Sequence, residues 1–190
     1  MQKGKIILIS GPSGVGKRTI LESILADQNL NIKYSISATT RPKRENEIHG
    51  KDYFFMTIPE FEAGIKNGDF IEYATFCQNY YGTPKAYLNQ EINAGNNILL
   101  EIEVQGVKNI IKMYQPDELV TIFVLPPSME VLKERLVKRG TESPEVIAKR
   151  IETAIEEINN KDLYQYNVVN NEIDVVVKEI KDIIKRRINV

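Results

Sequence analysis

The sequence predicts an α/β fold, in which a parallel sheet flanked by helices carries a small inserted α+β lobe and a mobile lid. Three observations predict it. Short runs that are apolar at almost every position recur along the 190 residues, as buried parallel strands require. Segments with an apolar stripe at helical spacing lie between these runs. One stretch, about residues 34–84, instead holds short aromatic pieces around a short helical segment.

Four apolar runs are predicted to be the strands of the parallel sheet. They are residues 6–9, 97–100, 119–125 and 166–169. These runs hardly alternate between apolar and polar residues, so helices should cover both faces of the sheet. In open sheets of this kind, ligands bind beyond the carboxyl ends of the strands.

Helices are predicted between and after the strands. One begins behind Ser128 as a possible N-cap, and another behind Ser143, with Pro144 at its first position. The helical stripes fall within residues 20–25, 129–136, 147–158 and 174–187.

The stretch from 34 to 84 is predicted to be the inserted lobe. Residues 53–56 and 70–73 are its expected strands, and a helix from 60 to 66 is closed by Gly68. A second insertion, about residues 139–145, separates two helices and is predicted to be the lid. The chain is therefore expected to be a single domain, whose core comprises about residues 1–33, 85–138 and 146–190.

Composition excludes several classes of protein. Twenty-five basic and 26 acidic side chains give a net charge of -1, so neither a nucleic-acid coat nor a polybasic membrane anchor is indicated. Cys77 and His49 are the only residues of their types, which argues against a disulfide, a zinc site or a Ser-His-Asp triad. No run approaches the ~20 apolar residues of a membrane span, so the cytoplasm is the expected compartment.

A phosphate-binding loop follows the first predicted strand. Residues 11–17, Gly-Pro-Ser-Gly-Val-Gly-Lys, match the pattern G-x-x-x-x-G-K between a strand and a helix. Inward N–H groups and the helix N-terminus would hold phosphates, and Lys17 would lie on the outer ones. The next position usually carries a hydroxyl for Mg²⁺, but here it is Arg18, and Thr19 follows it.

Two further groups of charged residues suggest ligand contacts. Arg41 and Arg44 follow a cluster of hydroxyls, and their guanidinium forks suit a phosphate monoester. In isolation, this run is more typical of a solvated basic loop. Glu101 and Glu103 are expected to lie on one strand at its carboxyl end, pointing the same way, where they would suit metal binding or acid–base work.

With these motifs in place, the chain resembles the guanylate kinase family over nearly its whole length. The family's motifs occur here in the right order. They are residues 11–17, 37–44, 50–53, 70–73, 79–83, 101–106, 135–142, Arg150 and 169–170.

The resemblance implies transfer of the terminal phosphoryl group of ATP to GMP, with Mg²⁺ as cofactor. It implies that the GMP phosphate is held by Ser37, Arg41, Arg44, Tyr53 and Tyr81. It implies that guanine is read by Glu72, Thr83 and Glu103. ATP would contact Gly11, Pro12, Ser13, Gly14, Val15, Gly16, Lys17, Arg18 and Thr19, with Asn170 by the adenine. The charge of the transferred group would be neutralised by Lys17, Arg41, Arg135, Arg139 and Arg150. Metal contacts would come from Thr19 and Glu101, mostly through ATP and water.

The chemistry of guanine supports this assignment independently. Guanine presents two neighbouring N–H donors, and a carboxylate such as Glu72 accepts both, whereas adenine would leave it partly unpaired. Such a site can discriminate by roughly 10⁴-fold. Two alternatives stay open: a non-catalytic scaffold of the same fold that binds phosphopeptides, which Arg18 favours, and a kinase for another small acceptor. A monomer and a homodimer are both compatible with the sequence.

Overall fold

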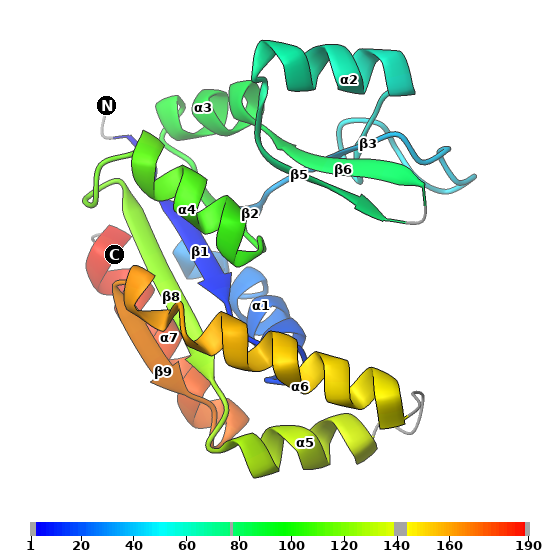
Figure 1. Cartoon of the computed structure of the whole chain (residues 1–190). Helices are drawn as coiled ribbons and strands as arrows, with labels where there is room; N and C mark the ends of the chain where they lie inside the picture. The colour runs from blue at the N-terminus through cyan, green and yellow to red at the C-terminus, as the bar shows by residue number, and fades with distance from the viewer. Residues whose placement is uncertain (1–2, 77, 139–143, 189–190) are drawn as a thin grey trace.

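Two separate sheets organise the chain in the computed structural model, which describes residues 3–76, 78–138 and 144–188 (Figure 1). The larger sheet has five strands in the order β2-β7-β1-β8-β9, and every pairing in it is parallel. Its strands are β1 (Ile6–Ser10), β2 (Ile32–Tyr34), β7 (Asn97–Leu100), β8 (Leu119–Leu125) and β9 (Tyr166–Val169). The four predicted strands are confirmed, and β2, which the sequence analysis did not predict, forms one edge.

Helices cover both faces of this sheet because successive residues of a strand point to opposite sides. Ile7 and Ile9 of β1 pack with α1 (Lys17–Leu25) and α7 (Ile173–Ile188), whereas Ile6 and Leu8 pack with the opposite layer. That layer contains α3 (Lys85–Asn93) and α4 (Val104–Met113). Neither α3 nor α4 was predicted. The two layers explain why β1 is apolar at every position up to Ser10.

A helical pair lies at one end of the sheet. Helices α5 (Met129–Lys138) and α6 (Pro144–Ile158) pack through Leu132, Leu136 and Ala154. The hydroxyl oxygen of Ser128 accepts a hydrogen bond of 3.3 Å from the N–H of Val131, as the predicted N-cap requires. The predicted cap Ser143 and residues 139–143 of the predicted lid lie outside the described residues.

The inserted lobe has its own sheet and its own core. Four strands in the order β4-β3-β6-β5 carry the helix α2 (Ile58–Asn67) on one side. The ring of Phe61 on α2 stacks on Phe70 with 4.2 Å between centroids and on Tyr80 with 5.1 Å. Gly68 ends α2 with a positive φ of 70°, as predicted. The strands are β3 (Ala38–Thr39), β4 (Phe54–Phe55), β5 (Phe70–Phe76) and β6 (Asn79–Pro84).

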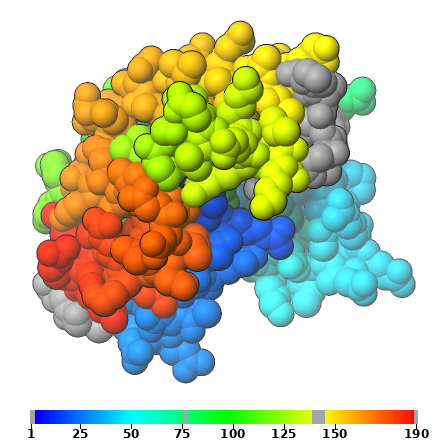
Figure 2. All heavy atoms as spheres, turned by 90° about the horizontal axis from the view of Figure 1, so that it is seen from below, coloured from blue at the N-terminus to red at the C-terminus, as the bar shows by residue number. Residues whose placement is uncertain are grey.

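Seen from below, the lobe (cyan) projects beside the surface formed by α5, α6 and α7 (Figure 2). Short 3-10 turns at Gln28–Leu30 and Lys161–Leu163 complete the described elements. No helix in the described part of the chain is long and apolar enough to cross a membrane.

The arrangement brings several strand ends to one edge of the parallel sheet. Leu8 pairs with Leu100, and Ser10 pairs with Phe123 on the other side of β1. The segments that leave β1, β7 and β8 therefore start close together. This edge is where an open α/β sheet binds its ligands.

Candidate active site at the strand ends

A cavity of about 260 Å³ lies at this edge. Its walls include residues of the predicted phosphate loop, among them Ser13 and Lys17, and three carboxylates. These are Glu101 and Glu103, which follow β7, and Glu157 on α6. The expectation that Glu101 and Glu103 lie on a strand is wrong, because β7 ends at Leu100 and Glu103 is already the N-cap position of α4. Both nevertheless border the same cavity.

Lys17 is the cation inside this cavity. Its ammonium donates hydrogen bonds to the carbonyl oxygens of Gly11 and Pro12, so the side chain folds back over its own loop. Burial lowers the pKa of Lys17, and the nearby carboxylates, Glu157 foremost, oppose that shift. A half-buried cation surrounded by loop backbone is the arrangement expected where phosphate groups bind.

Arg18 and Thr19 do not border the cavity. The Nε of Arg18 lies 2.8 Å from Oε1 of Glu22, one helical turn away, and the Arg18 side chain is 92% exposed. The guanidinium therefore points outward from the start of α1, as expected if it replaces a metal-binding hydroxyl without entering the site. Thr19 is exposed on the same helix. The structure therefore does not bring the predicted metal ligand Thr19 to Glu101.

Two of the predicted phosphate-neutralising arginines, Arg135 and Arg150, lie near the loop. Nη1 of Arg150 on α6 donates a hydrogen bond of 2.9 Å to the hydroxyl of Ser13. Nη2 of Arg135 on α5 donates one of 3.2 Å to the carbonyl of Asn170. Arg139 lies outside the described residues. Helix α6 therefore presents Arg150 and, two turns later, Glu157 to the same loop region.

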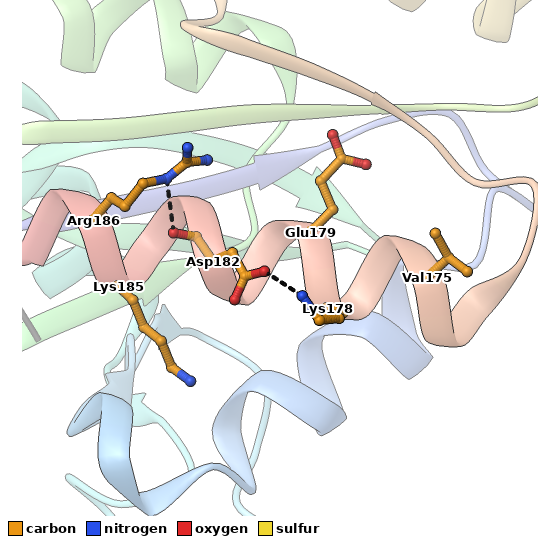
Figure 3. Close-up of a pocket in the computed structure, with 6 residues that line it drawn as sticks. All are labelled: Val175, Lys178, Glu179, Asp182, Lys185 and Arg186. Atoms are coloured by element: carbon orange, nitrogen blue, oxygen red, sulfur yellow. Dashed lines mark hydrogen bonds and ion pairs between the residues drawn. The ribbon is translucent and has the colours of Figure 1, made fainter.

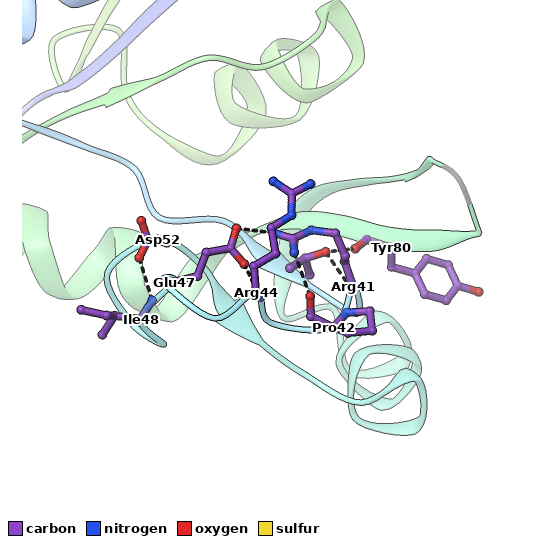
Figure 4. A network of polar contacts seen from close by, with 8 residues as sticks. Arg41, Pro42, Arg44, Glu47, Ile48, Asp52 and Tyr80 are labelled. Carbon is purple, nitrogen blue, oxygen red and sulfur yellow. Dashed lines mark hydrogen bonds and ion pairs between the residues drawn. The ribbon is translucent and has the colours of Figure 1, made fainter.

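A polar network in the lobe organises the two arginines expected at the GMP phosphate (Figure 4). Nη2 of Arg41 lies 2.6 Å from Oε1 of Glu47, and the N–H of Arg44 donates to the other carboxylate oxygen at 2.8 Å. The Arg44 guanidinium extends away from this network. The hydrogen bond from Arg41 lowers the pKa of Glu47, and the same bond raises the pKa of Arg41. Glu47 thus holds Arg41 in place, a role that the sequence analysis missed.

Two predicted tyrosines border the same network. The Cζ of Arg41 lies 5.5 Å from the ring centre of Tyr53, which is 6.2 Å from the ring centre of Tyr81. Ser37 lies just before β3, where its carbonyl accepts the N–H of Phe54. The lobe therefore gathers a guanidinium and two phenols, which are donors suited to a phosphate monoester.

A half-buried carboxylate lies between the lobe and α4. The hydroxyl of Thr83 donates a hydrogen bond of 2.7 Å to Oε1 of Glu72. Burial raises the pKa of Glu72, the Thr83 hydroxyl lowers it, and the charge of Glu103 raises it further. A β-carbon on residue 106 would lie only 2.7 Å from Cγ of Glu72, so Gly106 lets α4 approach this side chain closely. The three predicted guanine-reading residues are therefore brought together.

Glu101 has a second neighbour that the sequence analysis missed. The hydroxyl of Tyr34 lies 3.4 Å from its Oε2. Burial, together with the charge of Glu101, raises the pKa of Tyr34 to about 12. The phenol therefore stays protonated and donates to Oε2 of Glu101, whose side chain also borders the cavity and offers carboxylate oxygens as hard donors. Such an oxygen fits Mg²⁺, which takes few protein ligands and keeps several waters.

Another hollow of the surface differs from the cavity at the strand ends, because a single helix lines it. It runs along α7, and all six residues that line it belong to that one helix (Figure 3). Within it, Lys178 pairs with Asp182 at 2.8 Å and Arg186 donates to the Asp182 carbonyl. These contacts are typical of a solvated helix face.

The positions of Glu47 and Glu157 in the sequence show regular spacings from predicted site residues. Glu47 follows Arg44 at the same three-residue interval that separates Arg41 from Arg44. Glu157 lies seven residues after Arg150, which places both on one face of a helix. Neither spacing distinguishes a site residue from a solvated charge without the fold.

Comparison with known proteins is consistent with this geometry. The family model described as "Guanylate kinase" matches residues 3–187. Guanylate kinases of Streptococcus agalactiae serotype III (strain NEM316) and serotype V (strain ATCC BAA-611 / 2603 V/R) are each 49% identical over 184 residues. Those matches cover 97% of this chain and 87% of the relatives. The crystal structure of guanylate kinase from Anaplasma phagocytophilum matches with a TM-score of 0.67 and 33% identity, covering 98% of this chain and 87% of that one.

Proposed function

Because this chain belongs to the guanylate kinase family, it transfers the terminal phosphoryl group of ATP to GMP, and we propose that the residues described above divide this work between two half-sites. The loop around Lys17 holds the donor phosphates. The lobe holds GMP. The observation that supports the proposal is the position of Glu103 between the two half-sites. Glu103 borders the Lys17 cavity, and its charge also raises the pKa of Glu72.

The acceptor half-site reads both ends of GMP. Arg41 and Arg44, with Ser37, Tyr53 and Tyr81, take the phosphate, since guanidinium forks and phenols donate to its oxygens. Glu72 accepts the N–H groups of guanine, while the Thr83 hydroxyl fixes its orientation. Glu72, Thr83 and Tyr81 lie on neighbouring strands of one small sheet, and the other groups lie on segments that flank its strands. The lobe therefore sets the distance between phosphate and base.

The reaction needs alignment and neutralisation of charge more than proton transfer. An oxygen of the GMP phosphate, already deprotonated at neutral pH, attacks the γ-phosphorus of ATP. The bond from that phosphorus to the bridging oxygen breaks, and ADP leaves with the electron pair. Lys17 and the arginines Arg41, Arg135, Arg139 and Arg150 balance the charge of the transferred group.

A magnesium ion fits this site. It would be held by ATP oxygens and water with Glu101, whose oxygen donors suit a hard cation, and would supply positive charge to the phosphates. The exposed position of Thr19 does not support a metal contact from that residue. We place the activity in the cytoplasm, on small nucleotides rather than nucleic acid or membranes, in a monomer or a homodimer.

One assay tests the proposal. ADP release from ATP is measured with GMP, dGMP, AMP, CMP and UMP side by side. GMP is expected to be preferred by a wide margin over the three nucleotides that lack guanine. Equal rates with AMP and GMP would overturn the role of Glu72, and no transfer to any acceptor would favour a phosphopeptide-binding scaffold.

A further inference from the structure

Asn170 is buried between the end of β9 and the phosphate loop. It is 4% exposed. Its backbone N–H donates a hydrogen bond of 2.8 Å to the carbonyl of Leu125 at the end of β8. Its side-chain amide donates one of 2.7 Å to the carbonyl of Val15 within the loop. Because a carbonyl can only accept, the amide nitrogen must face Val15.

The loop backbone packs directly against this amide. A β-carbon on residue 16 would lie 2.7 Å from Nδ2 of Asn170, and Gly16 has a positive φ of 97°. Both the close approach and the conformation therefore require glycine there. The Asn170 carbonyl, in turn, accepts the hydrogen bond from Arg135. One residue thus contacts the loop through its side chain and the α5 arginine through its backbone.

The geometry of the peptide bond gives this contact a consequence. In a trans peptide the C=O of one residue and the N–H of the next point in opposite directions. Holding the Val15 carbonyl toward Asn170 therefore turns the Gly16 N–H away from Asn170. An unbraced Val15–Gly16 peptide, next to a glycine with wide conformational freedom, would be able to rotate.

We propose that Asn170 is a positioning residue that fixes the Val15–Gly16 peptide, so that the Gly16 N–H is aimed at the phosphates of the donor. The proposal rests on the proposed function. It assigns the amide nitrogen of Asn170 to the loop, in addition to the adenine contact that the family resemblance led us to expect. The hydrogen bond to Val15 engages Nδ2 of the amide, and Oδ1 keeps its capacity to accept a hydrogen bond from a base.

The first test measures binding without any base or acceptor. Binding of tripolyphosphate is followed by calorimetry for the wild-type protein, N170A and N170D, and for N171A as a matched control on the exposed neighbouring residue. Removing the buried donor leaves the Val15 carbonyl unpaired, so N170A should bind tripolyphosphate at least about tenfold more weakly. N170D places a carboxylate oxygen against the carbonyl and should bind more weakly still. N171A should match the wild type.

The second test compares donors. With GMP as acceptor, N170A should lower kcat/KM for ITP as well as for ATP and leave the KM for GMP unchanged. A residue that only reads adenine would instead lower kcat/KM for ATP and leave kcat/KM for ITP unchanged. A purely structural role would lower thermal stability but leave tripolyphosphate affinity of the folded protein unchanged, and either result would overturn the proposal.

The thermal unfolding of each variant is measured first, and both tests are run at a temperature at which all the variants are folded. If N170A is unfolded at that temperature, N170S takes its place, because it removes the same amide and is compared with the wild type in the same way. Tripolyphosphate binding does not depend on phosphoryl transfer to GMP, so the two proposals can fail separately. If the proposed function is wrong, the wild-type protein fails the acceptor assay. If the role of Asn170 is wrong, the wild type and N170A bind tripolyphosphate with equal affinity.

Discussion

The hydroxyl of Thr83 and the carboxylate of Glu72 meet at 2.7 Å, across two neighbouring strands of the lobe. This bond engages Oε1 and orients the carboxylate, which also lies against Gly106 of α4. The lobe and the core therefore both define the position of the side chain that we expect to select guanine.

The substitution Glu72→Gln should impair the use of GMP much more than the use of ATP. It keeps an oxygen for Thr83 but turns one acceptor toward guanine into a donor. Losing a hydrogen bond to a charged group should lower kcat/KM for GMP by about 10- to 100-fold and change the KM for ATP much less. Steady-state kinetics with each substrate varied in turn measures both. Equal losses for the two substrates would contradict a base-reading role.

The same variant should be more stable than the wild type at neutral pH. Burial raises the pKa of Glu72 in the folded protein. Glu72 therefore contributes fully to the free energy of unfolding below the unfolded pKa of about 4.3, where the carboxyl is protonated. This contribution is lost as the pH rises through the folded pKa. The difference in Tm between E72Q and the wild type should be positive at pH 7 and shrink toward pH 4. A difference that does not vary with pH would show that the Glu72 charge is not destabilising.

Replacing Lys17 should remove activity and leave the fold. Lys17→Ala deletes the cation of the phosphate cavity, and a loss of about 100-fold or more in kcat is expected. Circular dichroism and the unfolding midpoint should remain close to those of the wild type. Lys66→Ala, on the exposed side of α2, is the control for removing a lysine. Wild-type rates in K17A would mean that the loop does not take part in transfer.

Glu47→Gln should affect GMP through Arg41. The substitution removes the charge that holds the guanidinium at 2.6 Å. We expect a several-fold rise in the KM for GMP with little change in the KM for ATP. Glu45→Gln alters the same loop by the same charge at an exposed position, and it should behave like the wild type. An unchanged KM in E47Q would show that Arg41 keeps its place without Glu47.

Arg18→Ser should reduce the Mg²⁺ concentration needed for half-maximal rate, because it restores a hydroxyl at the position where phosphate loops usually carry one. Arg18→Ala is the matched variant, which removes the same exposed ion pair with Glu22 but adds no hydroxyl, and it should not reduce the Mg²⁺ requirement. The rate is measured against Mg²⁺ at fixed ATP and GMP. Loss of most activity in R18S would mean that Arg18 itself neutralises phosphate.

The sequence predicted the elements with strong local patterns. Strands buried on both faces are apolar throughout, so β1, β7, β8 and β9 were located within one residue of their ends. Ser128 and Gly68 marked helix ends through their own hydrogen bonds and backbone conformation. Short strands such as β2 and β3 carry no such pattern, because they are defined by pairing with distant residues.

Helix α4 shows why part of the site was misassigned. Glu101 and Glu103 follow an apolar run without a break, so no local pattern indicates that the strand stops at Leu100. The contacts of Glu47, Glu157 and Tyr34 depend on segments far apart in the chain. The clustering of Glu72, Thr83 and Glu103 was expected from the family resemblance and not from any pattern of spacing.

The stacked rings of Phe61, Phe70 and Tyr80 give the lobe a hydrophobic centre separate from those of the main sheet. One uninterrupted stretch of chain encodes that centre together with the strands around it. This makes the lobe a candidate for transplantation between related kinases, as a cassette that sets which nucleotide is phosphorylated. Such a graft of residues 38–84 would transfer Glu72 and Thr83 but leave Glu103 in the host, so the third contact to the base would have to be exchanged separately.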